Sequence, residues 1–167
     1  YCPRCGTPLS DHEVAQGYKE VSDPSIFVTM RLIDKPDTFF LVWTTTPWTL
    51  ISNVAIAMSP NETYVTVQYG DKKLILAEAR LGVLPESFEI IDRNLGKEYD
   101  GVRYEPLYNF YKVEKGHFAA MADFVTMEEG SGIVHMAPAF GADDYELGRK
   151  AGLSIIQAVN IKGNFFP

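Results

Sequence analysis

Four threonine hydroxyls and both tryptophans gather in one short stretch, WTTTPWTLISN, at residues 43–53. Threonine suits a strand, yet Thr46 is followed directly by Pro47, which cannot donate a hydrogen bond to a sheet ladder. The strand is therefore predicted to end there, which places the hydroxyls at its carboxyl end. A threonine run by itself is most often plain sheet surface, so a second feature is needed to predict chemistry.

A second stretch, GIVHMAPAFGADD at residues 132–144, interrupts the apolar pattern of its own strand. His135 lies within the strand, Pro138 ends it, and Asp143 and Asp144 fall in the first turn of a predicted helix. Histidine suits acid–base chemistry, and the N-terminus of a helix favours negative charge. The alternative interpretations are a buried core histidine and aspartates that only cap the helix.

The two cysteines lie in YCPRCG at residues 1–6, with the spacing of a zinc-ribbon knuckle. A structural zinc ion needs four ligands, so Cys2 and Cys5 would supply half of its site. His12 has a spacing that does not suit a third ligand. A redox pair and two unreactive thiols are the alternatives, and two cysteines are too few for an extracellular disulfide framework.

The composition limits the class of protein. With 167 residues, 46% of them hydrophobic, the chain can form one domain with a sizeable core. No run of about 18 apolar residues could cross a membrane, and the opening residues predict no signal peptide, so a cytoplasmic location is expected. Because the net charge is −7, contacts with nucleic acid should be local or supported by something outside the chain.

Short strands must position these residues. Residues 1–24 are turn-rich and are predicted to be irregular, and short helices are predicted at 77–83 and at 140–151, with Gly152 as the C-terminal stop. Hairpins are predicted around Gly70-Asp71 and between 118–126 and 133–137. The fold class is therefore mainly β (α+β), a barrel-like domain with small peripheral helices. Strands are predicted at 25–32, 39–46, 53–58, 64–69, 73–76, 88–91, 101–104, 118–126, 133–137, 154–159 and 164–166.

Taken together, WTTTPWTL and, about 80 residues later, GSGIVHMAPAFGADDY resemble the editing domain inserted into the catalytic core of isoleucyl-tRNA synthetase. The resemblance covers essentially the whole chain, with half of a zinc knuckle in the segment 1–24 and the editing domain at 25–167. Thr46 makes it specific, because valyl and leucyl enzymes carry arginine there. The chain departs from the family at Ile51, usually proline, and at Ser131, usually threonine.

The resemblance implies a hydrolytic function. A pocket shaped for isoleucine cannot strongly reject valine, a limit for which this pair of amino acids is the standard example. A second site would therefore clear valine from the 3′ end of mischarged tRNA(Ile), or from valyl-adenylate, by water attack. The signatures of the ATP-dependent aminoacylation site are absent from this chain, so the rest of the synthetase is an expected partner. Editing would need no cofactor, and cysteines outside the chain would complete a structural zinc site with Cys2 and Cys5.

The resemblance also assigns roles by position. Asp144, nine residues after the histidine, would anchor the α-ammonium group, and His135 would exclude the longer isoleucine side chain, with a general base as its alternative role. The threonines would surround the terminal adenosine and the ester, and Trp48 would pack against the ligand or support the loop. The expected catalytic residues are Thr45, Thr46 and Asp144, and the expected substrate-binding residues are Thr44, Thr45, Thr46, Trp48, Thr49, Asn53, His135 and Asp144.

Two rival functions stay open at this point. The corresponding domain of a valyl enzyme would clear threonine, although Thr46 in place of arginine argues against it. A non-catalytic zinc-ribbon binding module would use its threonines only to fill a sheet. Neither a Ser-His-Asp order nor a second cluster of metal ligands is present, so a covalent or metal-dependent hydrolase is poorly supported.

Overall fold

The computed structural model describes residues 2, 4–20, 22, 24–85 and 87–166, and its regular elements are mostly short strands. The helices are α1 (Asp11–Ala15) and α2 (Ala142–Ala151), with 3₁₀ helices η1 (Pro47–Ser52), η2 (Glu78–Val83) and η3 (Gly96–Tyr99). The strands are β1 (Ile26–Arg31), β2 (Thr38–Thr44), β3 (Ala55–Met58), β4 (Thr63–Tyr69), β5 (Lys72–Ala77), β6 (Glu89–Leu95), β7 (Ala119–Met121) and β8 (Ile133–Met136).

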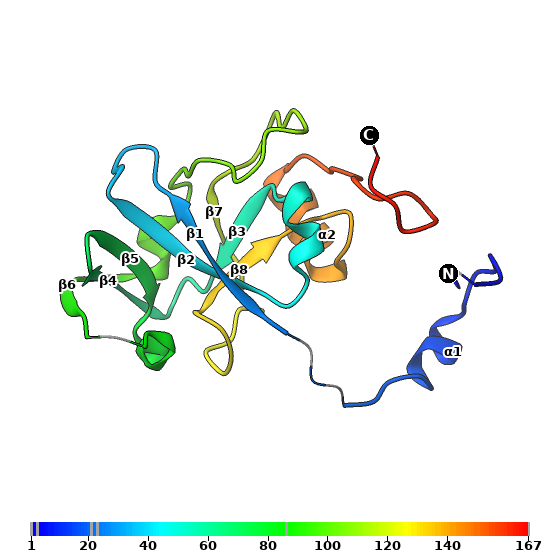
Figure 1. Ribbon diagram of the computed structural model, residues 1–167, viewed down its shortest axis with the longest axis horizontal. Helices are drawn as coiled ribbons and strands as arrows, with labels where there is room; N and C mark the ends of the chain where they lie inside the picture. Colours follow the sequence, from blue (N-terminus) through cyan, green and yellow to red (C-terminus); the bar gives the residue numbers. More distant parts are fainter. Residues whose placement is uncertain (1, 3, 21, 23, 86, 167) are drawn as a thin grey trace.

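The eight strands form one sheet in the order β6-β4-β5-β2-β8-β3-β7, and β1 pairs with β2 outside this path. The sheet curves into half a barrel, and the short helices lie outside it (Figure 1). The predicted class, mainly β with small peripheral helices, is confirmed. No helix in the described ranges is long and apolar enough to cross a membrane.

Strand β2 determines where the site lies. β1 pairs with it antiparallel along its length, from Ile26↔Thr44 to Arg31↔Phe39. β5 pairs parallel with the beginning of β2, whereas β8 pairs parallel with its end, at Trp43↔Val134. Because β2 and β8 run in the same direction, the loops that leave their carboxyl ends emerge at the same edge of the sheet.

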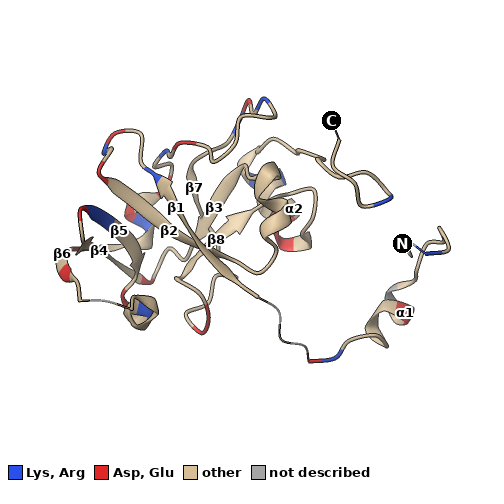
Figure 2. Ribbon diagram, viewed as in Figure 1, with Lys and Arg blue, Asp and Glu red and all other residues tan. Residues whose placement is uncertain are grey.

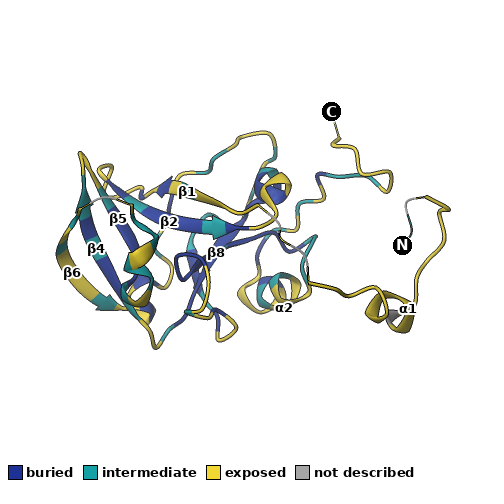
Figure 3. Cartoon of the chain, turned by 60° about the horizontal axis from the view of Figure 1, so that its bottom comes forward, coloured by how far each residue is buried: buried dark blue, intermediate teal, exposed yellow. Residues whose placement is uncertain are grey.

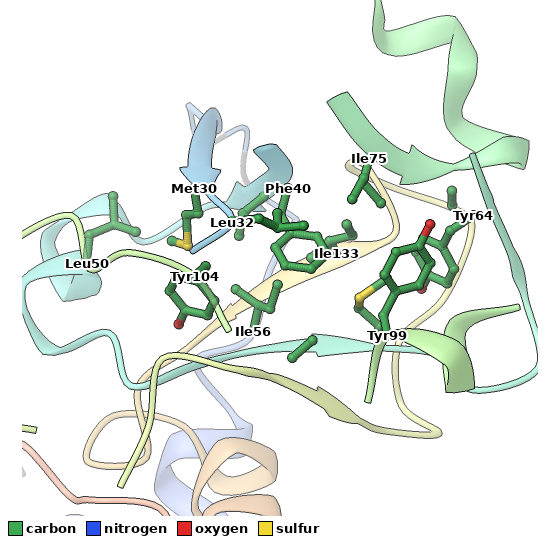
Figure 4. Packing of buried hydrophobic residues seen from close by; sticks show 14 residues of the cluster. Met30, Leu32, Phe40, Leu50, Ile56, Tyr64, Ile75, Tyr99, Tyr104 and Ile133 are labelled. Carbon is green, nitrogen blue, oxygen red and sulfur yellow. The ribbon is translucent and has the colours of Figure 1, made fainter. Parts of the chain in front are cut away.

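The core lies within the curve of the sheet. β3 is buried along its whole length and β2 and β8 are nearly so, whereas most residues of β6 are exposed (Figure 3). Continuous apolar runs such as AIAM in β3 are typical of strands that are covered on both faces. Met30, Phe40, Ile56, Tyr64 and Tyr104 are among the largest side chains that are fully buried (Figure 4).

The structure differs from the sequence-based prediction in how distant strands pair. The hairpin predicted from 118–126 and 133–137 is wrong, because β3 lies between β7 and β8, parallel to the first and antiparallel to the second. The buried, apolar β3 needs a partner on each edge, and this requirement outweighs the pairing of segments close in sequence. Residues 101–104, 154–159 and 164–166 contribute only isolated bridges.

The helices differ less from the prediction. α2 is confirmed, and Gly152 ends it in the left-handed conformation, with φ of 66°, which glycine adopts without strain. The helix predicted at 77–83 is the 3₁₀ helix η2. The segment 1–24 contains the unpredicted α1, whose N-terminus is stabilised by a capping box between Ser10 and Glu13.

Candidate functional site

The threonine stretch forms a turn that its own hydroxyls stabilise. β2 ends at Thr44, and Pro47 occupies the first turn of η1, where its missing N–H costs nothing. Thr44 Oγ1 accepts the N–H of Thr46 at 3.1 Å, and Thr49 Oγ1 donates to the carbonyl of Thr46 at 2.7 Å. Thr44 and Thr49 are buried, whereas Thr45 and Thr46 are exposed, so the last two are the threonines that a ligand can contact.

His135 joins β8 to this turn and is only 5% exposed. Its Nε2 lies 2.9 Å from Thr49 Oγ1, and its Nδ1 lies 2.8 Å from the side-chain nitrogen of Asn53. Because the hydroxyl of Thr49 already donates to Thr46, Nε2 must donate to Thr49, while the Asn53 amide donates to Nδ1. The ring is therefore neutral, with its proton on Nε2. Burial lowers the pKa of His135 to about 4, which is consistent with this state.

Asn53 holds the histidine from the other side. Its Nδ2 also donates to the carbonyl of Ala55 at 2.8 Å, and its Oδ1 accepts from the hydroxyl of Tyr104 at 2.7 Å. Nε2 of His117 lies 3.3 Å from the carbonyl of Asn53, to which it donates. The contact between Tyr104 and Asn53 was not predicted, because the sequence around Tyr104 indicates only a short strand at 101–104 and no local pattern connects that strand to the threonine turn.

Asp144 lies in the first turn of α2 and connects the helix to the end of β8. Its Oδ2 accepts the N–H of Ala137 at 2.8 Å, and within the described part of the chain this is the carboxylate's one hydrogen bond. Burial raises the pKa of Asp144 above its ordinary value, while the bond from Ala137 opposes that shift. Oδ1 of Asp144 accepts no hydrogen bond from the described residues. Asp143, one position earlier, is exposed.

The segment after β2 and the loop after β8 are also in contact through aromatic rings. The rings of Trp48 and Phe140 pack edge to face with their centroids 5.1 Å apart, and Trp48 is 48% exposed. The structure thus joins Thr44, Thr46, Thr49, Asn53 and His135 into one hydrogen-bonded network, with Trp48 and Asp144 on the loops beside it. Thr45 is next to the network but makes no side-chain hydrogen bond among the described residues. Cys2 and Cys5 lie apart from it, in the N-terminal segment (Figure 1).

Backbone hydrogen bonds form a tight turn around the two cysteines. Gly6 N donates to the carbonyl of Cys2, Cys2 N donates to the carbonyl of Thr7, and both bonds measure 2.9 Å. The hydroxyl of Thr7, 3.1 Å from Cys5 Sγ, is the main reason that the pKa of Cys5 falls to about 7, which favours the thiolate that binds metal. Within the described ranges, no three histidine, cysteine or acidic side chains are grouped closely enough to hold a metal ion.

A large cavity of about 730 Å³ lies away from this network. It is lined by the turn between β1 and β2, by β6 and by η3, and it includes Asp37, Lys73, Asp92 and Arg103. Its charged residues are of mixed sign, and Asp37 and Lys73 already pair with each other at 2.6 Å. The threonine–histidine network is the better candidate site, because it combines a fixed neutral ring with exposed hydroxyls.

Acid is expected to destabilise this protein through His135. An unfolded histidine binds a proton near pH 6.5, whereas His135 does so near pH 4, so its contribution to stability is complete above pH 6.5 and is lost as the pH falls toward 4. From pH 7 to pH 5 the loss should be about 2 kcal/mol. Urea unfolding at both pH values should show a correspondingly smaller loss for His135→Gln, which cannot titrate there.

Burial also lowers the pKa of His117, so a part of the acid-dependent loss should persist in both proteins. Identical pH dependence in the wild type and in His135→Gln would contradict the neutral, buried state of His135.

The fold and the position of the site define a class of protein: the chain has the editing-domain fold of aminoacyl-tRNA synthetases. It matches GlLeuRS-CP1 with a TM-score of 0.65 at 17% identity, covering 76% of this chain and 60% of that one. It matches the editing domain of the P. knowlesi cytosolic leucyl-tRNA synthetase with a TM-score of 0.60 at 17% identity, over 77% and 62% of the two chains. At these identities the likeness shows the fold alone.

Sequence comparison narrows the class to a family. The chain is homologous to isoleucine–tRNA ligases, and it spans only 16% of the length of those relatives. The ligase of Thermus thermophilus is 48% identical over 98% of this chain, that of Thermoplasma acidophilum 45% over 99%, and that of Clostridium acetobutylicum 47% over 99%. No protein-family model matches the chain.

Proposed function

We propose that this chain is the editing domain of an isoleucine–tRNA ligase and hydrolyses valine from mischarged tRNA(Ile). One observation carries the proposal: Thr49 links the exposed Thr45–Thr46 turn to the buried, neutral ring of His135, where the parallel strands β2 and β8 end. This arrangement presents hydroxyl and backbone groups to an ester beside a fixed steric wall. Homology to isoleucine–tRNA ligases supports the same function.

The reaction is water attack on the ester between valine and the terminal adenosine. The hydroxyls of Thr45 and Thr46, with the backbone groups of their turn, orient the water and stabilise the developing oxyanion. The free oxygen of Asp144 binds the α-ammonium group of the amino acid, and this contact positions the carbonyl. Thr44, Thr49 and Asn53 support the turn, and Trp48 covers the ligand.

His135 acts as a steric gate and not as a general base. Both of its ring nitrogens are engaged, since Nδ1 accepts from Asn53 and Nε2 donates to Thr49. A pKa of about 4 also makes it a weak base at neutral pH, far from the value that suits proton transfer best. The ring instead occupies the space that the extra methyl group of isoleucine would need.

The partners follow from the reaction. The domain binds the 3′ end of tRNA(Ile) and the valine moiety, while the rest of the synthetase holds the tRNA body in the cytoplasm. Lys and Arg are scattered over loops, strands and helices, among Asp and Glu (Figure 2). This distribution suits a local contact with the tRNA end.

Cys2 and Cys5 hold half of a structural zinc site, which cysteines outside the chain complete. Editing itself needs no cofactor in this proposal. Zinc content of the full-length protein tests the metal site, because Cys5→Ser should lower it.

The two rival functions have less support. The relatives reported above are isoleucine–tRNA ligases and not valyl enzymes, which argues against a domain that clears threonine. A non-catalytic zinc-ribbon module does not account for the hydrogen-bonded network around His135.

Deacylation of valyl- and isoleucyl-tRNA(Ile) by the full-length ligase tests the function. The wild type should cleave the valyl ester and spare the isoleucyl ester. Replacing Thr45 and Thr46 together with alanine should lower the rate on valyl-tRNA by about 100-fold, while affinity for a non-hydrolysable valyl-adenosine analogue changes by less than roughly threefold. The reason is that hydroxyls aimed at water and oxyanion act mainly in the transition state.

The matched control replaces Thr29 and Thr126, two exposed threonines away from the site, and should leave the rate unchanged. Equal losses of rate and affinity would reassign Thr45 and Thr46 to plain binding. A wild type that leaves valyl-tRNA intact would refute the function.

A further inference from the structure

We infer that Tyr104 is a positioning residue that sets the specificity of the proposed editing reaction by fixing, through Asn53, the orientation of the His135 ring. The inference rests on the proposed function and adds to it a residue that lies outside the threonine and histidine stretches. Tyr104 is fully buried, so it cannot touch the substrate, and it acts only through its neighbours.

The core holds Tyr104 rigidly. Its ring packs edge to face on Phe40, with centroids 6.5 Å apart, and on His117, with centroids 5.8 Å apart. Its backbone bridges to Leu32, and its N–H donates to the carbonyl of His117 at 3.0 Å. Figure 4 shows Tyr104 within the apolar cluster, beside Met30 and Ile56. The direction of its hydroxyl is therefore set by packing.

The hydroxyl of Tyr104 begins a chain of hydrogen bonds with a single direction. It donates to Asn53 Oδ1, Asn53 Nδ2 donates to His135 Nδ1, and His135 Nε2 donates to Thr49. Thr49 in turn donates to the carbonyl of Thr46, in the turn that faces the substrate. In this series, the side chain that accepts one hydrogen bond donates the next, so the direction of each bond determines the direction of the one that follows.

The direction of these hydrogen bonds depends on the orientation of the Asn53 side-chain amide. A flipped amide would turn Oδ1 toward the carbonyl of Ala55 and toward His135 Nδ1, and would turn its N–H groups toward Tyr104. Two neighbours oppose the flip, namely the carbonyl of Ala55 and the hydroxyl of Tyr104. Without the hydroxyl, Oδ1 would be a buried acceptor with no partner, and only Ala55 would still hold the amide.

The orientation of the amide matters because the gate must discriminate a single methyl group. A ring held at both nitrogens stays in one place, whereas a ring held by Thr49 alone can tilt. Small displacements of a positioned group are enough to change selectivity markedly. Loss of the Tyr104 hydroxyl should therefore admit isoleucine.

The chain contains a matched control, Tyr64. Both tyrosines are fully buried in the same apolar cluster, and each hydroxyl donates to an oxygen 2.7 Å away, for Tyr64 the carbonyl of Gly132. They lie at opposite ends of the cluster in Figure 4. The hydroxyl of Tyr64 also accepts the N–H of Ser59 at 2.9 Å, so its removal should cost at least as much stability, but only Tyr104 contacts Asn53.

The experiment compares Tyr104→Phe with Tyr64→Phe in the full-length ligase. The readout is kcat/KM for isoleucyl-tRNA(Ile) divided by kcat/KM for valyl-tRNA(Ile). Tyr104→Phe should raise this ratio by about tenfold, the order expected for one lost hydrogen bond to a buried neutral group. Tyr64→Phe should leave the ratio unchanged, even where it lowers the melting temperature as much.

A double-mutant cycle isolates the path through the histidine. If Tyr104 acts through His135, then Tyr104→Phe should change the ratio no further once His135 is alanine. Asn53→Leu, a side chain of similar size, provides a second test, because leucine can neither accept from Tyr104 nor hydrogen-bond to His135 Nδ1. It should raise the ratio in the same direction, including in the case that Tyr104→Phe does not fold.

An unchanged ratio in Tyr104→Phe, an equal change in Tyr64→Phe, or an additive effect with His135→Ala would overturn the inference. If Tyr104→Phe does not fold, an unchanged ratio in Asn53→Leu would overturn the inference. Failure of the proposed function would look different, since the wild type would then leave valyl-tRNA uncleaved.

Discussion

Replacing Asp144 with alanine is expected to abolish measurable binding of a non-hydrolysable valyl-adenosine analogue to the full-length ligase. The α-ammonium group of the ligand would lose its carboxylate partner in a partly buried site, and removal of such a partner should weaken affinity by at least about 100-fold. Calorimetric titration of the wild type and the variant measures the effect. Unchanged affinity would show that the ammonium group is bound elsewhere.

Asp144 also bonds the N–H of Ala137, so the alanine variant should lose about 1–3 kcal/mol of stability as well. Asp144→Asn separates the two roles, because its amide oxygen can still accept from Ala137 although the charge is gone. Asp144→Asn should therefore keep the stability of the wild type and lose the affinity for the valyl-adenosine analogue. Asp143→Ala, at the exposed neighbouring position, should change neither.

Replacing His135 with alanine is expected to let the site hydrolyse correctly charged isoleucyl-tRNA(Ile), which the wild type spares. If the ring is a steric gate, its removal opens space for one more methyl group, and isoleucyl cleavage should rise to within about tenfold of valyl cleavage. The valine reaction should survive, weakened by the loss of the partner of Asn53 and Thr49. Deacylation of the two charged tRNAs by the variant measures both effects.

The opposite result would support the general base. Loss of valine cleavage with no gain on isoleucyl-tRNA would show that the ring transfers a proton, and a pH–rate profile of the wild type would then have a limb at its titration. His12→Ala is the control, because that histidine is exposed and lies in the N-terminal segment, outside the hydrogen-bonded network. It should leave isoleucyl-tRNA intact.

Local patterns predicted the elements that carry the site. Pro47 predicted that the strand ends at Thr46, and β2 ends two residues earlier, at Thr44. The acidic turn and Gly152 predicted the limits of α2, and the Gly70-Asp71 turn predicted the hairpin of β4 and β5. These features depend on backbone constraints and turn preferences within a few residues, so a single sequence contains the information to find them.

The sequence did not predict which distant segments pair with each other. The predicted hairpin between 118–126 and 133–137 failed because the apolar strand β3 is inserted between its two arms. The length and polarity of each strand were visible in the sequence, but not which buried strands would lie side by side. Burial of apolar surface favours many pairings about equally, and the complete packing of the core selects among them.

The sequence by itself determined that hydroxyls, a histidine and a carboxylate stand at the ends of strands, because prolines and a helix start fix those positions locally. Only the tertiary structure decided what each group does to the others. Thr49 and His135 meet across 86 positions, and Tyr104 and Asn53 across 51. The parallel pairing of β2 with β8 makes the first contact, and the buried ring of Tyr104 makes the second. The protonation state of His135 depends on both, because a hydrogen-bond donor is defined by its neighbours in space.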